Sequence, residues 1–486
     1  MDELLREEMS KLRNLTVNFA ATDTSIRQME SNYLKQVINL CLNLLKFVIA
    51  LKVSQKIGKP PTVQKKEQIK NSGKRRRNYL SLFGLIEFTR PSFHSNQRGM
   101  LYVVDECLDM PKELWSYNLQ ELTSANATQT NFRESVKTLN SLLDLDLTDV
   151  GAKRNINYLG VEVENYYEQK PIEKPEGPIC FSASFDGKGV PKIKPLDKTK
   201  PKETKRLGKG EKRGVKQMAT VGVISYFEPK QREVDSIIRG LMEYGGKDKE
   251  STESLEKPEE NDNRWHQDIH RRAFLADQDK CIDYGIGRIK SMINHPQSRF
   301  VVPIDAGIGL EDKVMKSVKE HGLSDRFDGI ILDIIHVSEY VWDSANAVLG
   351  EGSKLRADWV KEMLEDLLNS KTKKVISDLI QLRDKGNLTK NKKEKLQKAI
   401  TYFTNHHHKM DYKTYIEKGY PVSSALVESN CKHLVKDRME LSGMRWSSKG
   451  AQNMMDMRAV KLNGDLPDFI NFMELKNRKI NLAIAA

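Results

Sequence analysis

Two apolar segments that each end in an aspartate constrain the fold of this chain more than any other feature. The segments are CFSASFD (180–186) and RFVVPID (299–305), and each is followed by small residues. Short apolar runs bounded by turn residues are typical of buried β-strands. We therefore expect strands that end at Asp186 and Asp305, where loops at a sheet edge could expose both carboxylates.

The surrounding sequence predicts a mixed α/β domain. Its further expected elements are strands at 189–193, 217–227 and 329–335, and helices at 279–294, 310–322 and 423–440. Residues 338–418 have a helical pattern almost throughout. This order predicts a mixed five-stranded sheet flanked by helices, with an α-helical insertion before the last helix. The plan resembles the RNase H-like fold.

Changes in pattern along the chain predict six segments. They are an N-terminal helical region (1–60), a DNA-binding region with strands and a helix-turn-helix (61–178), the first part of the RNase H-like catalytic domain (179–345), a helical insertion (346–419), the last part of the catalytic domain (420–465) and a C-terminal tail (466–486). Within the second segment we expect a basic linker up to about residue 77 and short strands at 78–88 and 100–106.

The charge of the chain favours a polyanionic partner. Its 486 residues include 80 Lys and Arg against 67 Asp and Glu, a formal net charge of +13. Such a surplus is typical of proteins that bind nucleic acid. The five cysteines lie far apart without a CxxC pair, which indicates reduced thiols in a cytoplasmic protein and no zinc site.

The most apolar stretch, at 37–53, is interrupted by Asn39, Asn43, Lys46 and Lys52. Asn39, Asn43 and Lys46 are spaced four and three positions apart and so form one face of a helix, from which we expect an amphipathic helix and no membrane span. Its apolar face would pack against the next domain or against a second copy of the chain.

A pair of helices at 131–143 and 147–160 is expected in the DNA-binding region, with Thr148 as the N-cap of the second helix and Gly160 as its stop. A helix-turn-helix of this kind would offer Lys153, Arg154 and Asn157 to DNA. Helix pairs also occur in pure packing roles.

Asp186, Asp305 and Glu428 are the candidate catalytic and metal-binding residues. Two aspartates at strand ends and a glutamate from the 423–440 helix make an all-oxygen site suited to Mg²⁺ or Mn²⁺. Paired ions held in this way clamp the attacking and leaving oxygens of a phosphodiester displacement. The simpler interpretation of each is a turn aspartate or a surface ion pair.

Asp333 and His336 form a second group, which we expect to support the site as an orienting or hydrogen-bonded pair. Asp333 remains the alternative to Asp305 as the second metal ligand.

Several basic and aromatic residues are candidate contacts to DNA. Lys432 and Lys436 would share a helical face with Glu428, and Trp446 could stack on a base or anchor the core. The remaining candidates are Lys205, Arg206, Lys209, Lys212 and Arg213 in a Gly-rich loop, together with Arg438 and Arg445.

Two stretches, SFDGKGVP…RLGKGEKRGVKQMATVGVISYF…REV (184–234) and SSALVESNCKHLVKDRMELSGMRWSSKGAQNMMDMRAVKLNGD (423–465), resemble the ISKra group of bacterial insertion-sequence transposases, which belong to the DDE superfamily. The block ILDIIHVSEYVW (331–342) agrees. The resemblance covers roughly residues 78–465, and the block around Glu428 is its most specific part.

The resemblance implies a metal-dependent enzyme that cuts and joins double-stranded DNA at transposon ends. It maps the catalytic triad onto Asp186, Asp305 and Glu428, and matches Asp333 and His336 to an Asp-x-x-His element of related transposases. Relatives usually show Asp-Gly where this chain has Asp305-Ala306, and many carry a cysteine-based zinc motif that is missing here. At least a homodimer is expected, because two ends must be brought together.

Two alternatives share these features. One is a transposase-derived DNA-binding protein that no longer cuts, and the other is a metal-dependent nuclease without strand transfer. In each case the expected location is the bacterial cytoplasm, on the nucleoid when bound to DNA.

Overall fold

The computed structural model describes residues 2–57, 68–193, 215–245, 266–307, 309–350, 353, 355–385 and 388–483. Contacts divide the chain into two units. We call them the N-terminal unit (Met1–Gln169 with Gly464–Ala486) and the sheet unit (Lys170–Asn463). Each is described by itself.

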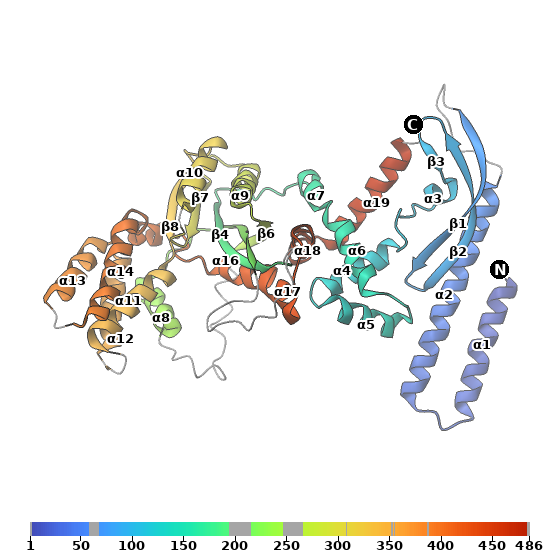
Figure 1. Cartoon of the computed structure of the whole chain (residues 1–486), viewed down its shortest axis with the longest axis horizontal. Coiled ribbons are helices and arrows are strands. Elements are labelled where there is room, and N and C mark those ends of the chain that lie inside the picture. The colour runs from blue at the N-terminus through green and yellow to red at the C-terminus, as the bar shows by residue number, and fades with distance from the viewer. Residues whose placement is uncertain are drawn as a thin grey trace, which may run out of the picture. The chain divides into compact units, whose positions relative to one another are not determined.

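The sheet unit is built on a mixed five-stranded sheet, as the sequence predicted (Figure 1). Its strands are β4 (Cys180–Pro191), β5 (Lys216–Phe227), β6 (Gln267–Leu275), β7 (Arg299–Ile304) and β8 (Phe327–Leu332). They lie in the order β6-β5-β4-β7-β8. The pairs β4/β5 and β5/β6 are antiparallel, whereas β4/β7 and β7/β8 are parallel.

Three of the expected strands need correction. The segment 189–193 is no separate strand, because β4 runs through Asp186 to Pro191 and pairs with β5 along its whole length. The fifth strand is instead β6, whose buried His270 and Arg272 interrupt the apolar pattern that sequence reasoning relies on. The last strand, expected at 329–335, ends at Leu332, because Asp333 caps the following helix.

Helices cover both faces of this sheet. The helices of the sheet unit are, in chain order, α8 (Val234–Gly245), α9 (Gln278–Met292), α10 (Leu310–Glu320), α11 (Ile334–Leu349), α12 (Arg356–Leu368), α13 (Thr372–Lys385), α14 (Lys390–His406), α15 (Tyr412–Glu417), α16 (Ala425–Asn430), α17 (Asp437–Met439) and α18 (Ser448–Leu462). Helices α9 and α10 pack on one face around Phe181 and Phe185. Helices α8, α11, α12 and α14 form a second core with the other face.

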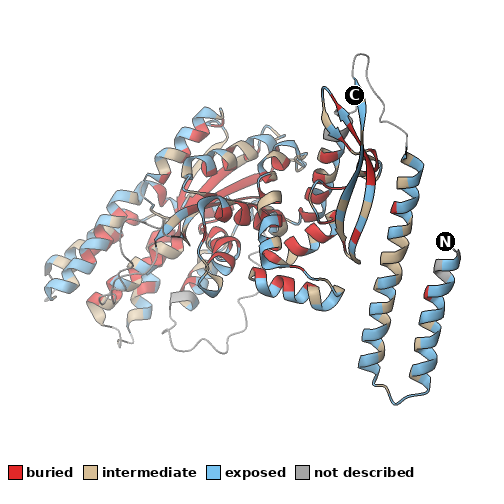
Figure 2. Cartoon of the chain, turned by 45° about the vertical axis from the view of Figure 1, so that its right-hand side comes forward, coloured by how far each residue is buried: buried red, intermediate tan, exposed pale blue. Residues whose placement is uncertain are grey.

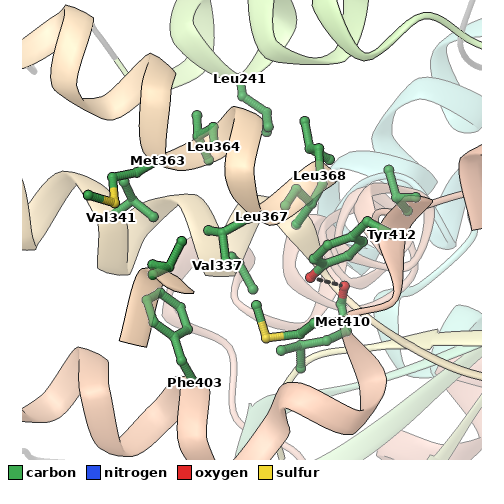
Figure 3. Close-up of a cluster of buried hydrophobic side chains, with 14 of the residues drawn as sticks. Leu241, Val337, Val341, Met363, Leu364, Leu367, Leu368, Phe403, Met410 and Tyr412 are labelled. Atoms are coloured by element: carbon green, nitrogen blue, oxygen red, sulfur yellow. Dashed lines mark hydrogen bonds between the residues drawn. The ribbon is translucent and has the colours of Figure 1, made fainter. Parts of the chain in front are cut away.

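That second core joins the helical insertion to the sheet (Figure 3). Val337, Leu364, Leu367 and Phe403 meet in it from three different helices. The hydroxyl of Tyr412 donates a hydrogen bond to the carbonyl oxygen of Leu332 at 2.8 Å. The insertion therefore holds the end of β8 in place, next to the candidate site.

The N-terminal unit contains a three-stranded antiparallel sheet and helices. Its elements are α1 (Asp2–Ala20), α2 (Ile26–Lys56), β1 (Ile69–Ser81), β2 (Gly84–Ser95), β3 (Gly99–Leu101), α3 (Val103–Cys107), α4 (Tyr117–Ala127), α5 (Phe132–Leu143), α6 (Asp149–Gly160), α7 (Val163–Gln169) and α19 (Leu466–Ala483). The expected helix pair is confirmed as α5 and α6. Thr148 caps α6 by accepting from the Gly151 amide at 3.0 Å, and α6 ends at Gly160.

Four expectations for this unit are wrong. The segment expected as one strand at 78–88 contains the end of β1, a turn and the start of β2. The basic run at 74–77 lies in strand β1 and not in a linker, because it pairs with residues 88–91 of β2. The segment expected as a strand at 100–106 divides into β3 and α3. The expected tail contains helix α19, whose Phe469 and Phe472 pack edge-on against Tyr166 with ring centroids 5.4 and 5.5 Å away.

Helix α2 is the one helix among the described residues that is long and apolar enough to cross a membrane. The criterion rests on length and composition alone, so a single such helix is weak evidence for a membrane protein.

Candidate active site at the edge of the sheet

The parallel register of β4 with β7 relates Asp186 to Asp305. Cys180 pairs with Arg299 and Ser182 with Val301, where the paired residues end. Continued further, the same register would set Asp186 opposite Asp305, just beyond the end of β7. The two aspartates are 119 residues apart in sequence.

Both aspartates also lie on the same face of the sheet. Side chains alternate between faces along a strand, and Cys180 and Val301 belong to the core on the insertion side. Asp186 and Asp305 share the parity of these residues, so they face that side as well.

Glu428 reaches this edge from α16, which packs on β4 and β5. One helical turn later, buried Cys431 lies close to Asp186. Burial and then the neighbouring Asp186 raise the pKa of Cys431 well above its ordinary value. The segment that follows Glu428 therefore passes near the first aspartate.

His336 joins α11 to Glu428. Its Nε2 lies 3.1 Å from Oε1 of Glu428, and its Nδ1 lies 3.3 Å from Oε2 of Glu339. The hydrogen bond to Glu428 is the largest cause that raises the pKa of His336 to about 9. The same bond lowers the pKa of Glu428, so the pair is ionised at neutral pH.

Asp333 is fully buried and is held by backbone groups on two sides. Its Oδ1 accepts from the amide of Ile335 at 2.7 Å, which caps α11. Its Oδ2 accepts from the amide of Ser424 at 3.0 Å and from the Ser424 hydroxyl. Burial raises the pKa of Asp333, although these hydrogen bonds act to lower it. Asp333 thus links the end of β8 to the start of α16.

The described residues contain one group of His, Cys, Asp and Glu side chains whose ligand atoms lie within 4.8 Å of one another: Asp333, His336 and Glu428. The three ligands expected from sequence do not form such a group. Asp186 and Asp305 each accept a hydrogen bond at Oδ1 from a nearby glycine amide, Gly187 at 2.5 Å and Gly307 at 3.0 Å. A carboxylate has further lone pairs, so these bonds leave room for a cation.

The helix after Glu428 is not a regular α-helix. Residues Cys431–Lys436 form a π-helical segment, in which hydrogen bonds run from i to i+5. The spacing of 3.6 residues per turn, on which the expected alignment of Lys432 and Lys436 with Glu428 depends, therefore does not hold through this segment. Both lysines are exposed.

Two candidate DNA contacts are part of the core. Arg438 has no exposed surface, and burial lowers its pKa to about 10. Trp446 is 5 % exposed and donates from Nε1 to the carbonyl oxygen of Met439 at 3.0 Å. The amide of Trp446 also bonds to Pro191 at the end of β4. Stacking of Trp446 on a base is therefore excluded in this conformation, whereas Arg445 is exposed.

The other candidate DNA contacts are distributed as follows. Lys153 and Arg154 are exposed on α6, and Asn157 is half-buried. The five basic residues at 205, 206, 209, 212 and 213 lie outside the described residues. Sequence reasoning missed the exposed Lys74, Arg75 and Arg76, since it placed them in a linker and not on β1.

The ion pair of His336 with Glu428 predicts a pH dependence in the metal-free protein. The raised pKa of His336 contributes stability that is complete below its ordinary value of 6.5 and is lost as the pH rises through about 9. The lowered pKa of Glu428 contributes stability above its ordinary value of 4.5, which is lost as the pH falls through the lowered pKa. The pair is thus fully effective between pH 4.5 and 6.5.

An NMR titration of the His336 imidazole is expected to give a pKa near 9. Glu428→Gln should return that pKa most of the way to 6.5, and Glu339→Gln should lower it less, because Glu339 is the weaker cause. A wild-type His336 that titrates at its ordinary value would contradict the ion pair.

Neither a scan against protein-family models nor a search of curated proteins finds a match to this chain.

Proposed function

We propose that this chain is a DDE transposase with an RNase H-like catalytic domain, which cuts DNA at transposon ends and joins the ends to target DNA. The observation that supports the proposal is the parallel pairing of β4 with β7, whose register, if continued, would set Asp186 opposite Asp305, together with the packing of the Glu428 helix on β4. Carboxylates from three distant segments at one sheet edge are what phosphodiester chemistry with metal ions requires.

The topology of the sheet unit supports this proposal. Three antiparallel strands are followed by two parallel strands that join through α10, and a helical insertion separates β8 from α16. The two stretches that resemble ISKra transposases fall on β4 to β5 and on α16 to α18, the parts of the fold that carry Asp186 and Glu428.

Asp186, Asp305 and Glu428 would hold Mg²⁺ or Mn²⁺, since hard cations prefer oxygen ligands. When bound, the ions would supply charge neutralisation at the phosphodiester and activation of the attacking water or 3′-OH. His336 orients the Glu428 carboxylate through the 3.1 Å contact. Asp333 fixes the start of α16.

In the proposed reaction, water attacks a phosphodiester at the element's end, and the broken bond releases a 3′-OH. That 3′-OH then attacks a phosphodiester of target DNA, so that one bond forms as another breaks. The partners are double-stranded transposon ends and target DNA, held by at least a dimer. The proposed place of action is the bacterial cytoplasm. Exposed Lys153, Arg154, Arg445 and the basic residues of β1 are available for phosphate contacts.

The test is cleavage and joining of DNA that carries the ends of the encoding element, with Mg²⁺, Mn²⁺ or EDTA. We expect metal-dependent nicks that leave 3′-OH ends at the element boundary, followed by joined products with a target plasmid. Binding to these ends without cutting would favour the DNA-binding derivative. Cutting that never leads to joined products would favour a nuclease.

A further inference from the structure

Three faces of helix α2 bear on its packing, and two of them are covered within the N-terminal unit. Helix α1 covers the first. Buried Glu8 accepts from Nε2 of Gln36 at 3.0 Å and from Nδ2 of Asn43 at 3.1 Å. Tyr33 packs edge-on against Phe19 with ring centroids 5.3 Å apart.

The second face of α2 packs on the three-stranded sheet. Leu42, Leu45, Ile49 and Val53 contact a core that contains Ile86 of β2. Ile49 is the one fully buried residue of the helix. This contact fixes the orientation of α2, and therefore the direction in which its third face points.

The third face, which we call the α2 seam, is exposed. It consists of Leu34, Val37, Cys41, Leu44, Val48 and Leu51. Leu34, Val37, Val48 and Leu51 are 51, 45, 46 and 45 % exposed, and the two central residues are partly exposed. Figure 2 shows α2 in pale blue and tan along most of its length. Single exposed apolar residues are normal, but an ordered row of six is not.

The spacing of the α2 seam identifies the kind of partner it fits. The six residues follow one another at intervals of three, four, three, four and three. A 3.5-residue repeat keeps apolar side chains facing a second helix that winds around the first. The α2 seam is therefore shaped for a helix.

The order of residues in the α2 seam is close to palindromic, which points to a second copy of α2 in the antiparallel direction. In that alignment Leu34 meets Leu51 of the second copy, Val37 meets Val48, and Cys41 meets Leu44. Each pair joins side chains that fill similar positions in a coiled-coil core.

Charges beyond the ends of the α2 seam agree with this direction. Glu30 precedes the α2 seam at its N-terminal end, and Lys52 and Lys56 come after it at the C-terminal end. The antiparallel alignment brings Glu30 of one copy within a helical turn of both lysines of the other. A parallel alignment would set Glu30 against Glu30, which is unfavourable.

We propose that α2 pairs with α2 of a second copy of this chain, antiparallel, through the α2 seam. The inference does not depend on the proposed function. A lipid bilayer fits α2 less well, because Lys35, Asn39 and Lys46 form a polar strip and two faces are already covered by protein. A membrane-spanning helix would need those polar groups in hydrocarbon.

Disulfide trapping tests the direction of pairing. Starting from full-length Cys41→Ser/Cys107→Ser protein, one adds Leu34→Cys or Leu51→Cys and oxidises each variant alone and as a mixture. We expect a disulfide dimer in the mixture and little in either variant alone, because like positions lie about 25 Å apart in the antiparallel pair. Dimers in each variant alone would show parallel pairing, and no dimers in any sample would overturn the proposal.

The oligomeric state in solution tests whether the α2 seam is the contact between the two copies. Light scattering on a sizing column should find wild-type dimers, and Val37→Glu/Val48→Glu should weaken association at least about a hundredfold. Asn39→Glu, an exposed change on the same helix outside the α2 seam, is the matched control and should remain dimeric. Circular dichroism verifies that each variant folds. A monomeric wild type, or flotation with phosphatidylglycerol vesicles that the double variant abolishes, would overturn the proposal.

Discussion

Asp186→Asn, Asp305→Asn and Glu428→Gln are each expected to lower the rate of metal-dependent DNA cleavage at least about a hundredfold. Each change removes a negative charge from the proposed metal site, to which β4, the end of β7 and helix α16 would each supply one carboxylate. The amide side chains keep the size of the carboxylates, so the fold should be retained. Binding to transposon ends should remain within about twofold of wild type, because phosphate contacts dominate affinity.

The measurement compares single-turnover cleavage and end binding for the three variants. Asp283→Asn is a control, since Asp283 is an exposed aspartate of α9 that pairs with His321. It should cleave at the wild-type rate. Full activity of Asp305→Asn together with loss in Asp333→Asn and His336→Ala would move the metal site to the Asp333, His336 and Glu428 group. Normal cutting by Asp186→Asn would reject the proposed site altogether.

Asp333→Ala is expected to destabilise the sheet unit by about 3 kcal/mol, the sum of a lost N-cap and lost hydrogen bonds to a charged group. Asp333 has no exposed surface, and its two oxygens hold Ile335 and Ser424. Without the carboxylate, these buried donors lose their acceptor. Because Ser424 immediately precedes α16, the change should also loosen the helix that carries Glu428.

Urea unfolding followed by circular dichroism measures this loss. Asp343→Ala is the matched control, because Asp343 lies on the same helix α11 and is exposed. It should change the free energy of unfolding by less than about 0.5 kcal/mol. Asp333→Asn keeps one acceptor oxygen, so its loss in free energy of unfolding should lie between those of Asp333→Ala and Asp343→Ala. A fully stable Asp333→Ala would mean that Asp333 does not hold α16, which would favour a direct role in metal binding.

Much of the local structure was predictable, since it depends on patterns within a few residues. The helix pair α5 and α6, the cap at Thr148 and the stop at Gly160 follow from side chains that bond to their own backbone. The apolar runs of β4, β5, β7 and β8 were visible for a similar reason, because buried strands need apolar side chains.

Features that depend on distant partners were not predictable. Strand β6 was missed because its charged residues are buried and paired, as in the contact of Arg272 with Asp456 at 3.2 Å. The proposed roles of Arg438 and Trp446 failed because an arginine and a tryptophan can be buried where partners exist. No local pattern reveals that Trp446 extends the edge of β4 through Pro191.

The candidate site shows the same division. The sequence by itself determined that Asp305 follows a strand and that Glu428 lies on a late helix, because residue type and periodicity are local properties. It did not show that β4 continues beyond Asp186 to Pro191. Only the tertiary structure decided that the strand of Asp186 pairs in parallel with the strand before Asp305, that His336 contacts Glu428 across 92 positions of sequence, and that Asp333 is buried and bonded to Ser424 at the start of α16. These relations depend on strand order and register, which are set by the packing of the whole sheet unit.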